Sequence, residues 1–223
     1  GSRLENILDQ ILDDPEIEVT LVTSHRKPKD GAKDVVGIAV AKSRGIPTDY
    51  HNLIQMGLAN KKAHPDTYNE TVYRAIYMDM LGDFLSQEYY KADLWVMSGW
   101  NLILNQTIID KIRATGARLI NVHPFPLPGD DSEFINAPDG TKVKVERGEN
   151  TWIRAINDRL SWSGATVHEV LDDKFDTGPV LALEWLKIKP GETADSLRAK
   201  LNDVEDKIVP QAIKKIKEEL GSA

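Results

Sequence analysis

The segment RLINVHP, at residues 118–124, decides the fold and also points to the site. We expect a strand that ends at His123, because Pro124 keeps the preceding residues out of helical geometry. Residues two apart on a strand face the same side, so Asn121 and His123 should stand next to each other at its end. Ligands of open α/β sheets bind at the carboxyl ends of strands. The segment therefore predicts a strand that carries an amide and an imidazole into a site.

Short β-rich runs alternate with helical stretches on both sides of this segment, a pattern typical of parallel strands joined by crossover helices. Strands are expected at residues 18–23, 47–52, 93–99, 118–123, 165–171 and 180–188. Helices are expected from Ser2, which forms a capping box with Glu5, and at residues 35–43, 65–90, 107–114, 151–159 and 193–220. Pro210 is expected to kink or divide the last helix.

The last two expected strands lie too close in sequence for a crossover helix between them. The fold class is therefore α/β and Rossmann-like, with a mostly parallel sheet flanked by helices and a mixed or antiparallel C-terminal portion. Residues 129–150 are polar, and the turn signal Pro138-Asp139-Gly140 precedes alternating Val143 and Val145. We expect a hairpin-like excursion there.

The composition excludes several classes of protein. The chain has 223 residues, 41% of them apolar, a net charge of −7 and no cysteine. This length allows one large domain or two small ones, and the acidic balance argues against nucleic acid as a partner. The lack of cysteine excludes disulfides and thiolate chemistry, and no run is long and apolar enough for a membrane span. We therefore expect a cytoplasmic protein without a membrane or nucleic-acid partner.

Three polar sites stand out, each with a plain structural alternative. Asn121 and His123 can stabilise an oxyanion and move a proton, or they can simply satisfy local backbone groups. A carboxylate of the loop DDKFDTGP, at residues 172–179, can orient the imidazole, or the loop can be a solvated turn. Gly1-Ser2 at a helix start can bind phosphate, or it can be a cloning scar. None of the five histidines has zinc-binding spacing, so no metal site is expected.

Taken in order, the motifs of the chain resemble the phosphoribosylglycinamide (glycinamide ribonucleotide) formyltransferase family, one of the folate-dependent formyltransferases. The strand-borne NVHP at 121–124, followed by GATVH at 164–168 and DDKFDTGPVL at 172–181, is the specific combination. The other matching segments are GSRL at 1–4, EVTLVTSHR at 18–26, GIP at 45–47, DLWVMSG at 93–99 and LP at 127–128. The resemblance covers nearly the whole chain except residues 129–150, and it implies a single formyltransferase domain over residues 1–223.

The resemblance implies transfer of a formyl group from 10-formyltetrahydrofolate to the amine of glycinamide ribonucleotide, in purine biosynthesis, without a metal. It implies small-molecule partners only, and a monomer or homodimer. Carried over position by position, it assigns catalysis to Asn121, His123 and Asp176. It assigns the substrate phosphate to Gly1, Ser2 and Arg3, the folate to Asn101, Leu102, Ile103, Leu104 and Asp172, and the substrate sugar to Glu205.

The chain departs from the family pattern in several places. Members often have asparagine where this chain has Arg3, and Met-Arg where it has Asn101-Leu102. Residues 129–150 are expected to be an insertion that acts as a lid or alters which substrates enter. The family's first strand should precede Gly1, so we expect Gly1-Ser2 to be a native phosphate loop and the sequence to be part of a longer protein.

Other functions remain open at this point. A formyltetrahydrofolate deformylase, which uses water, or a sugar-nucleotide formyltransferase would share the fold. A methionyl-tRNA formyltransferase would need an RNA-binding domain and a basic surface, which the charge of −7 disfavours. A non-catalytic folate- or nucleotide-binding remnant would also keep the fold, but the intact trio Asn121, His123 and Asp176 argues against it.

Overall fold

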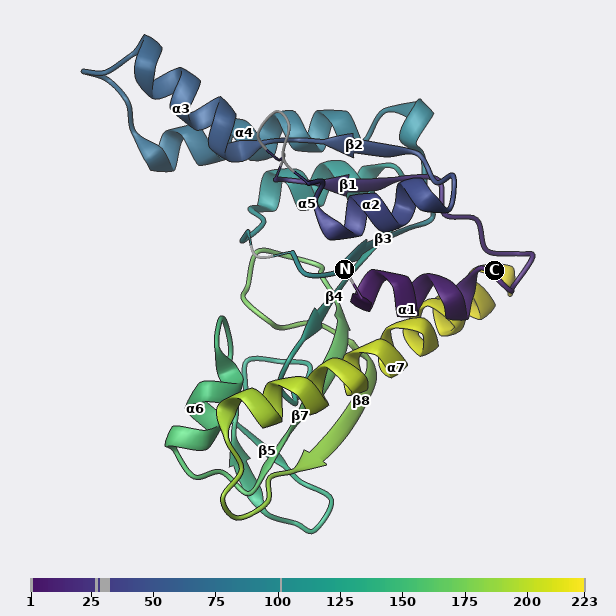
Figure 1. The fold of residues 1–223 in the computed structure, drawn as a ribbon, viewed down its shortest axis with the longest axis vertical. Helices are drawn as coiled ribbons and strands as arrows, with labels where there is room; N and C mark the ends of the chain where they lie inside the picture. The colour runs from purple at the N-terminus through teal and green to yellow at the C-terminus, as the bar shows by residue number, and fades with distance from the viewer. Residues whose placement is uncertain (1, 27, 29–32, 101, 223) are drawn as a thin grey trace.

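The computed structural model describes residues 2–26, 28, 33–100 and 102–222. Its central four-stranded sheet has the order β3-β4-β7-β8 (Figure 1). The bounds are β3 Leu94–Met97, β4 Arg118–His123, β7 Trp162–Glu169 and β8 Val180–Lys187. The pair β3–β4 is parallel, whereas β4–β7 and β7–β8 are antiparallel. The expected change from parallel to antiparallel pairing toward the C-terminus is thus confirmed.

A second, two-stranded parallel sheet pairs β1 Val22–Ser24 with β2 Thr48–Tyr50. The strand expected at residues 18–23 is therefore mostly wrong, because only Val22 and Thr23 of it pair with a neighbour. A cavity of about 1160 Å³ is lined by residues of β1 and β3, among others, and its lining includes Arg3. Asn121, His123 and Asp176 do not line this cavity.

Eight helical segments surround the strands in the described part of the chain. They are α1 Ser2–Ile11, α2 Val36–Ser43, α3 Leu53–Ala63, α4 Glu70–Leu85, the short 3-10 helix η1 Glu88–Tyr90, α5 Gln106–Ala114, α6 Thr151–Asn157 and α7 Ala194–Gly221. The sequence did not predict α3. The helix expected at residues 65–90 begins only at Glu70, where the Asn69 side chain accepts a hydrogen bond from Val72 N and caps it.

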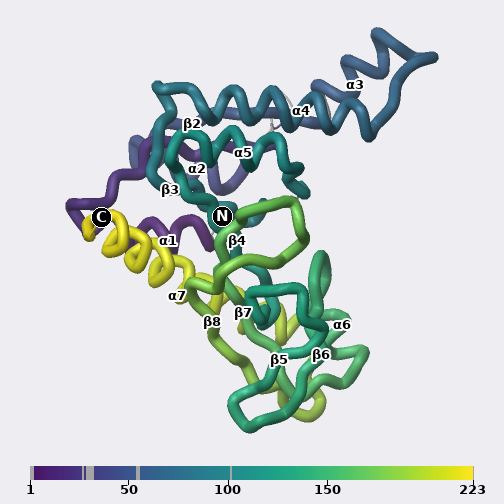
Figure 2. The backbone as a smooth tube through the Cα atoms, turned by 180° about the vertical axis from the view of Figure 1, so that it is seen from behind, coloured from purple at the N-terminus to yellow at the C-terminus, as the bar shows by residue number. Residues whose placement is uncertain are grey.

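Helices α1 and α7 run side by side, as both views show (Figures 1 and 2). Pro210 lies inside α7 but does not divide it, contrary to one of the two expectations. A proline has no N–H to bond the carbonyl four residues earlier, here that of Asp206. Gln10 Nε2 of α1 donates a hydrogen bond of 3.0 Å to the Asp206 carbonyl and so satisfies it. The neighbouring helix thus compensates for the proline.

Strand β4 lies between two layers of apolar side chains. Ile120 packs against residues of α1 and α7, whereas Leu119 packs against residues of α4 and α5. Successive residues of a strand face opposite sides, so Asn121 and His123 continue the Leu119 side beyond the core. Burial on both faces fixes the register of β4, and this register brings its polar end into the site.

Residues 134–144 form the expected hairpin of β5 Phe134–Asn136 and β6 Lys142–Lys144. Gly140 occupies the left-handed region (φ +83°) in its turn, as the Pro-Asp-Gly signal predicts. Val143 is buried in a small cluster with Phe125, Leu197 and other residues. Because Phe125 closely follows β4, this packing places β6 close to the end of β4.

Candidate active site

The antiparallel register of β4 and β7 aligns the polar side chains of the site. Asn121 lies opposite His168, and His123 lies opposite Thr166. Thr166 Oγ1 donates a hydrogen bond to the Phe125 carbonyl and accepts one from Leu127 N, each at 2.9 Å. These two bonds hold the turn after Pro124. The pairing of His123 with Thr166 holds the strand before it, so the position of His123 is fixed on both sides of Pro124.

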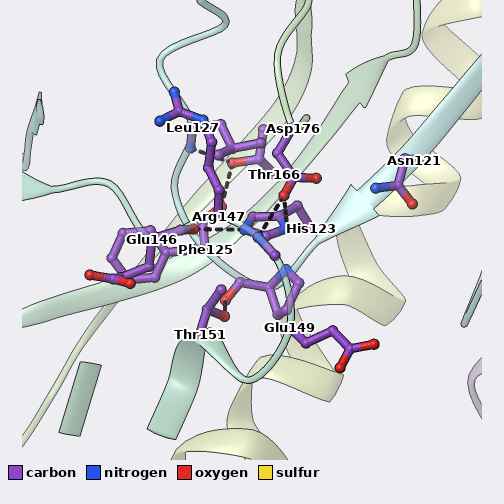
Figure 3. Close-up of polar contacts among 12 residues, drawn as sticks. Asn121, His123, Phe125, Leu127, Glu146, Arg147, Glu149, Thr151, Thr166 and Asp176 are labelled. Carbon is purple, nitrogen blue, oxygen red and sulfur yellow. Dashed lines mark hydrogen bonds and ion pairs between the residues drawn. The ribbon is translucent and has the colours of Figure 1, made fainter. Parts of the chain in front are cut away.

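His123 is paired with Asp176, the third expected catalytic residue (Figure 3). The distance from His123 Nδ1 to Asp176 Oδ2 is 3.2 Å, and the two side chains are only 4% and 8% exposed. His123 Nε2 lies 2.8 Å from the Glu146 carbonyl oxygen. The structure thus brings His123 and Asp176 into direct contact and engages both ring nitrogens.

The partners of His123 determine where its protons are. A carbonyl oxygen only accepts, so Nε2 carries a hydrogen and donates it to Glu146 O. Nδ1 faces a carboxylate, which also accepts, so a proton lies between Nδ1 and Oδ2 while this geometry is kept. Burial lowers the pKa of His123, and the negative charge of Asp176 opposes that shift. The Asp176 carboxylate therefore favours the protonated form of the His123 ring.

The backbone holds Asp176 in an uncommon conformation. Its φ of +50° lies in the left-handed region, and Gly148 N donates a 2.8 Å hydrogen bond to Oδ2. Two residues later, Gly178 has φ +107°, and a Cβ there would lie 2.3 Å from the Glu169 carbonyl oxygen. Only glycine fits this close approach of the loop to β7. Gly178 is thus needed for the loop to bring Asp176 to His123.

His168 lies on the other side of Asp176 and next to Asn121. Its Nδ1 is 2.9 Å from the Thr177 carbonyl oxygen, and its Nε2 is 3.4 Å from Asn121 Nδ2. Burial lowers the pKa of His168, which favours the neutral ring. When the neutral ring carries its hydrogen on Nδ1, Nδ1–H donates to the Thr177 carbonyl and Nε2 accepts from the Asn121 amide. The neutral His168 ring therefore orients the Asn121 amide.

The residues expected to bind phosphate and sugar meet in a separate ion-pair cluster. Arg3 Nη1 lies 2.6 Å from Glu205 Oε2, and Arg198 Nη1 lies 2.7 Å from Glu205 Oε1. Glu205 is buried, and each of its carboxylate oxygens forms an ion pair with one of the two arginines. Arg3 also donates to Asn202 Oδ1 at 2.8 Å. Gly1 and the side chain of Ser2 lie outside the described residues.

The expected folate residues have different environments. Leu104 is buried, and Leu102 packs against the same cluster, whereas the Ile103 side chain is 64% exposed. Asp172 lines a small cavity of about 330 Å³ at the loop 171–179, and its Oδ1 accepts a hydrogen bond from Lys174 N. Asn101 lies outside the described residues.

Three contributions to the site were missed by sequence reasoning: the Glu146 carbonyl, Gly148 N and Arg154, which holds their segment. The first two act through the backbone, so no side-chain pattern indicates them. Gly148 and Asn150, just before α6, are the available signal of a turn in this position.

Among the described residues, no cluster of three or more histidine, aspartate or glutamate side chains is arranged to hold a metal ion. Helices with the length and apolarity of a membrane span are also absent from that part of the chain.

Comparison with known families matches residues 1–213 to the formyl transferase family. Phosphoribosylglycinamide formyltransferase of Dictyostelium discoideum is 26% identical over 217 residues, covering 96% of this chain and 92% of that protein. Its counterpart from Escherichia coli K12 is 25% identical, covering 96% and 81%. The trifunctional purine biosynthetic protein adenosine-3 of Bos taurus is 23% identical, and the chain spans 17% of its length.

Solved structures share the fold. Glycinamide ribonucleotide transformylase 1 from Symbiobacterium toebii superposes with a TM-score of 0.70 at 21% identity, covering 98% of this chain and 83% of the other. Phosphoribosylglycinamide formyltransferase from Bacillus halodurans gives a TM-score of 0.67 at 23% identity, covering 97% and 90%. The expected α/β formyltransferase fold is thereby confirmed.

Proposed function

This chain belongs to the formyl transferase family, and on that premise we propose that it transfers the formyl group of 10-formyltetrahydrofolate to the amine of glycinamide ribonucleotide. The observation that carries the proposal is the buried His123–Asp176 pair at the end of β4, with Asn121 two residues earlier on the same strand. The similarity to phosphoribosylglycinamide formyltransferase of Dictyostelium discoideum over most of both chains supports the substrate assignment. The reaction is a step of purine biosynthesis.

In the first step, the substrate amine attacks the formyl carbon and forms a tetrahedral intermediate. We assign stabilisation of its oxyanion to the Asn121 amide, which His168 orients. An oxyanion donor of this kind is typically worth about 2.7–4 kcal/mol of barrier. His123 was expected to donate directly to the oxyanion as well. Because both of its ring nitrogens are engaged within the protein, we propose that it acts through Asp176 instead.

The second step moves a proton, for which we assign the His123–Asp176 pair. The attacking amine loses a proton, and the folate nitrogen gains one as its bond to the formyl carbon breaks. Asp176 Oδ1, the carboxylate oxygen that is not facing His123, is assigned to accept the amine proton directly or through water. The shared proton at Nδ1 lets the pair return a proton to the leaving nitrogen. None of these steps calls for a metal.

The remaining assignments also belong to the proposal. Gly1, Ser2 and Arg3 would bind the substrate phosphate, Glu205 would approach its sugar, and residues 101–104 with Asp172 would hold the pterin. Arg3 would then contact both Glu205 and the phosphate, because Arg3 Nη1 already lies 2.6 Å from Glu205 Oε2. We further propose that the protein is cytoplasmic, acts on small molecules only and is a monomer or homodimer.

The decisive experiment mixes purified protein with 10-formyltetrahydrofolate, with and without glycinamide ribonucleotide, and follows loss of the formyl cofactor. Loss only in the presence of the ribonucleotide supports the proposal. Loss without it identifies a deformylase, in which water replaces the amine. No loss in either case rejects both activities and supports a non-catalytic binding protein. The variant Asn121→Ala, assayed in parallel, verifies that any turnover comes from this site.

A further inference from the structure

The segment between β6 and α6, residues 145–150, caps the His123–Asp176 pair and is defined here as the capping turn. It supplies the Glu146 carbonyl to His123 Nε2 at 2.8 Å and Gly148 N to Asp176 Oδ2 at 2.8 Å. One turn therefore contacts both members of the pair through its backbone. Whatever fixes the backbone of this turn also fixes the orientation and protonation of the pair.

Arg154, on α6, holds the capping turn at three points. Its Nε donates to the Glu146 carboxylate at 2.5 Å, and its Nη2 donates to the Arg147 carbonyl at 2.6 Å. Its Nη1 donates to the Glu149 carbonyl. The planar guanidinium presents its donors in a rigid fork, so these contacts fix the turn in one arrangement. Arg154 itself does not touch His123 or Asp176 in these contacts.

The Glu146 side chain explains why an arginine is needed here. It is only 8% exposed, and a buried carboxylate without a partner is costly. Arg154 compensates its charge and, at the same time, places the Glu146 carbonyl against His123. The other end of the turn is held independently, because Thr151 Oγ1 donates to the Pro124 carbonyl at 2.8 Å.

We propose that Arg154 is a positioning residue for catalysis: it fixes the capping turn so that the Glu146 carbonyl holds His123 Nε2–H and Gly148 N holds Asp176. The inference rests on the proposed function for its kinetic consequence, but its structural part does not. The proposal also gives the capping turn a role. This turn is the last part of the segment 129–150, for which the family resemblance implies no function.

The kinetic test compares Arg154→Gln, Arg154→Lys and wild type in formyl transfer. Arg154→Gln is expected to lower kcat about 10- to 100-fold, as for other residues that orient a catalytic group, and to leave KM for both substrates within about twofold. Arg154→Lys keeps the charge but not the fork, so it should recover only part of kcat. The pH dependence of kcat should shift in Arg154→Gln, because the pair loses an acceptor at Nε2.

A matched control is Arg159→Gln, which removes the same charge from an exposed position just beyond α6. It should keep wild-type kcat and the wild-type pH profile. An equal fall in kcat in both variants would reduce the effect to overall charge and overturn the proposal. Unchanged kcat and pH profile in Arg154→Gln would overturn it as well.

Nitrogen NMR of the His123 ring tests the structural part without turnover. In wild type, Nε2 should be protonated and its proton should exchange slowly with water; in Arg154→Gln this exchange should quicken at least tenfold. If wild type fails to transfer formyl groups but this change is seen, the proposed function is wrong and the positioning role stands. An identical His123 spectrum in folded Arg154→Gln overturns the positioning role itself.

Discussion

Asn121 and His168 lie directly opposite each other on β4 and β7, with the amide nitrogen 3.4 Å from the imidazole Nε2. The Thr177 carbonyl accepts the Nδ1 hydrogen of His168, so Nε2 is left as an acceptor. The amide nitrogen of Asn121 is thereby held toward His168, and its orientation is set by a neutral histidine. The oxyanion donor of the proposed reaction thus depends on a residue from the neighbouring strand.

We expect His168→Leu to lower kcat substantially, because the Asn121 amide loses the acceptor that orients it. His168→Gln should restore much of the rate, since its amide can donate to Thr177 and accept from Asn121. Asn121→Ala alone should cost about 10²–10³ in kcat. Steady-state kinetics of the double variant provide the check: fully additive losses would contradict a shared role.

Asp176→Asn should keep the fold but lower turnover by orders of magnitude, because the charge that organises His123 and accepts the amine proton is removed. Circular dichroism and kcat measure the two effects separately. Asp173→Asn, an exposed position in the same loop, is the matched control and should retain the wild-type rate. Near-normal turnover of Asp176→Asn would reject the role assigned to this carboxylate.

The strand at 118–123 and the hairpin were predictable because their signals are local. Pro124 disfavours helical geometry in the residues before it, so the short apolar run at 118–123 indicates a strand, and Pro-Asp-Gly indicates a turn. The residues alone indicated only that a carboxylate of the loop 172–179 can orient His123, and the choice of Asp176 came from the family resemblance. Each polar site also had a plain structural interpretation. The functional interpretation was favoured only when the polar sites were considered together.

What escaped prediction depends on tertiary contacts. Helix α3 has Gly57 near its middle, which disfavours a helix by about 1 kcal/mol. A Cβ at Gly57 would meet the Tyr73 ring at 3.0 Å, so packing against α4 accounts for this glycine. The Glu146 carbonyl and Gly148 N could not be inferred from side-chain types either, because nearly every residue has these groups.

The protein should lose stability as the pH falls below 6.5. Burial lowers the pKa of His168 in the folded state below its ordinary value of 6.5. Below pH 6.5 the unfolded chain therefore binds a proton that the folded protein does not, so acid favours unfolding; above pH 6.5 this effect vanishes. The slope is at most about 1.4 kcal/mol per pH unit for one group. Urea unfolding at several pH values checks this, and His168→Gln should flatten the curve.

Arg3→Gln separates the ion pair with Glu205 from the proposed phosphate contact. Loss of a phosphate contact should raise KM for glycinamide ribonucleotide severalfold, with little change in KM for the folate. Loss of the ion pair should lower the free energy of unfolding, although Arg198 still compensates Glu205. Arg44→Gln, which breaks the surface pair with Asp9, is the control for a lost arginine on the α1 side. A destabilised Arg3→Gln variant with an unchanged KM would confine Arg3 to a structural role.

Gly178→Ala should abolish most activity by displacing Asp176. The new Cβ would lie 2.3 Å from the Glu169 carbonyl oxygen, so the loop must move away from β7, where Glu169 N now bonds the Pro179 carbonyl at 2.9 Å. Gly45→Ala is the matched control: its φ of +72° is also left-handed, but nothing lies within 4 Å of its Cβ. Its free energy of unfolding should fall only by the cost of a left-handed backbone for alanine, about 1–2 kcal/mol, and its kcat should stay at the wild-type value. Equal kcat in the two variants would show that the approach of the loop to β7 does not position Asp176.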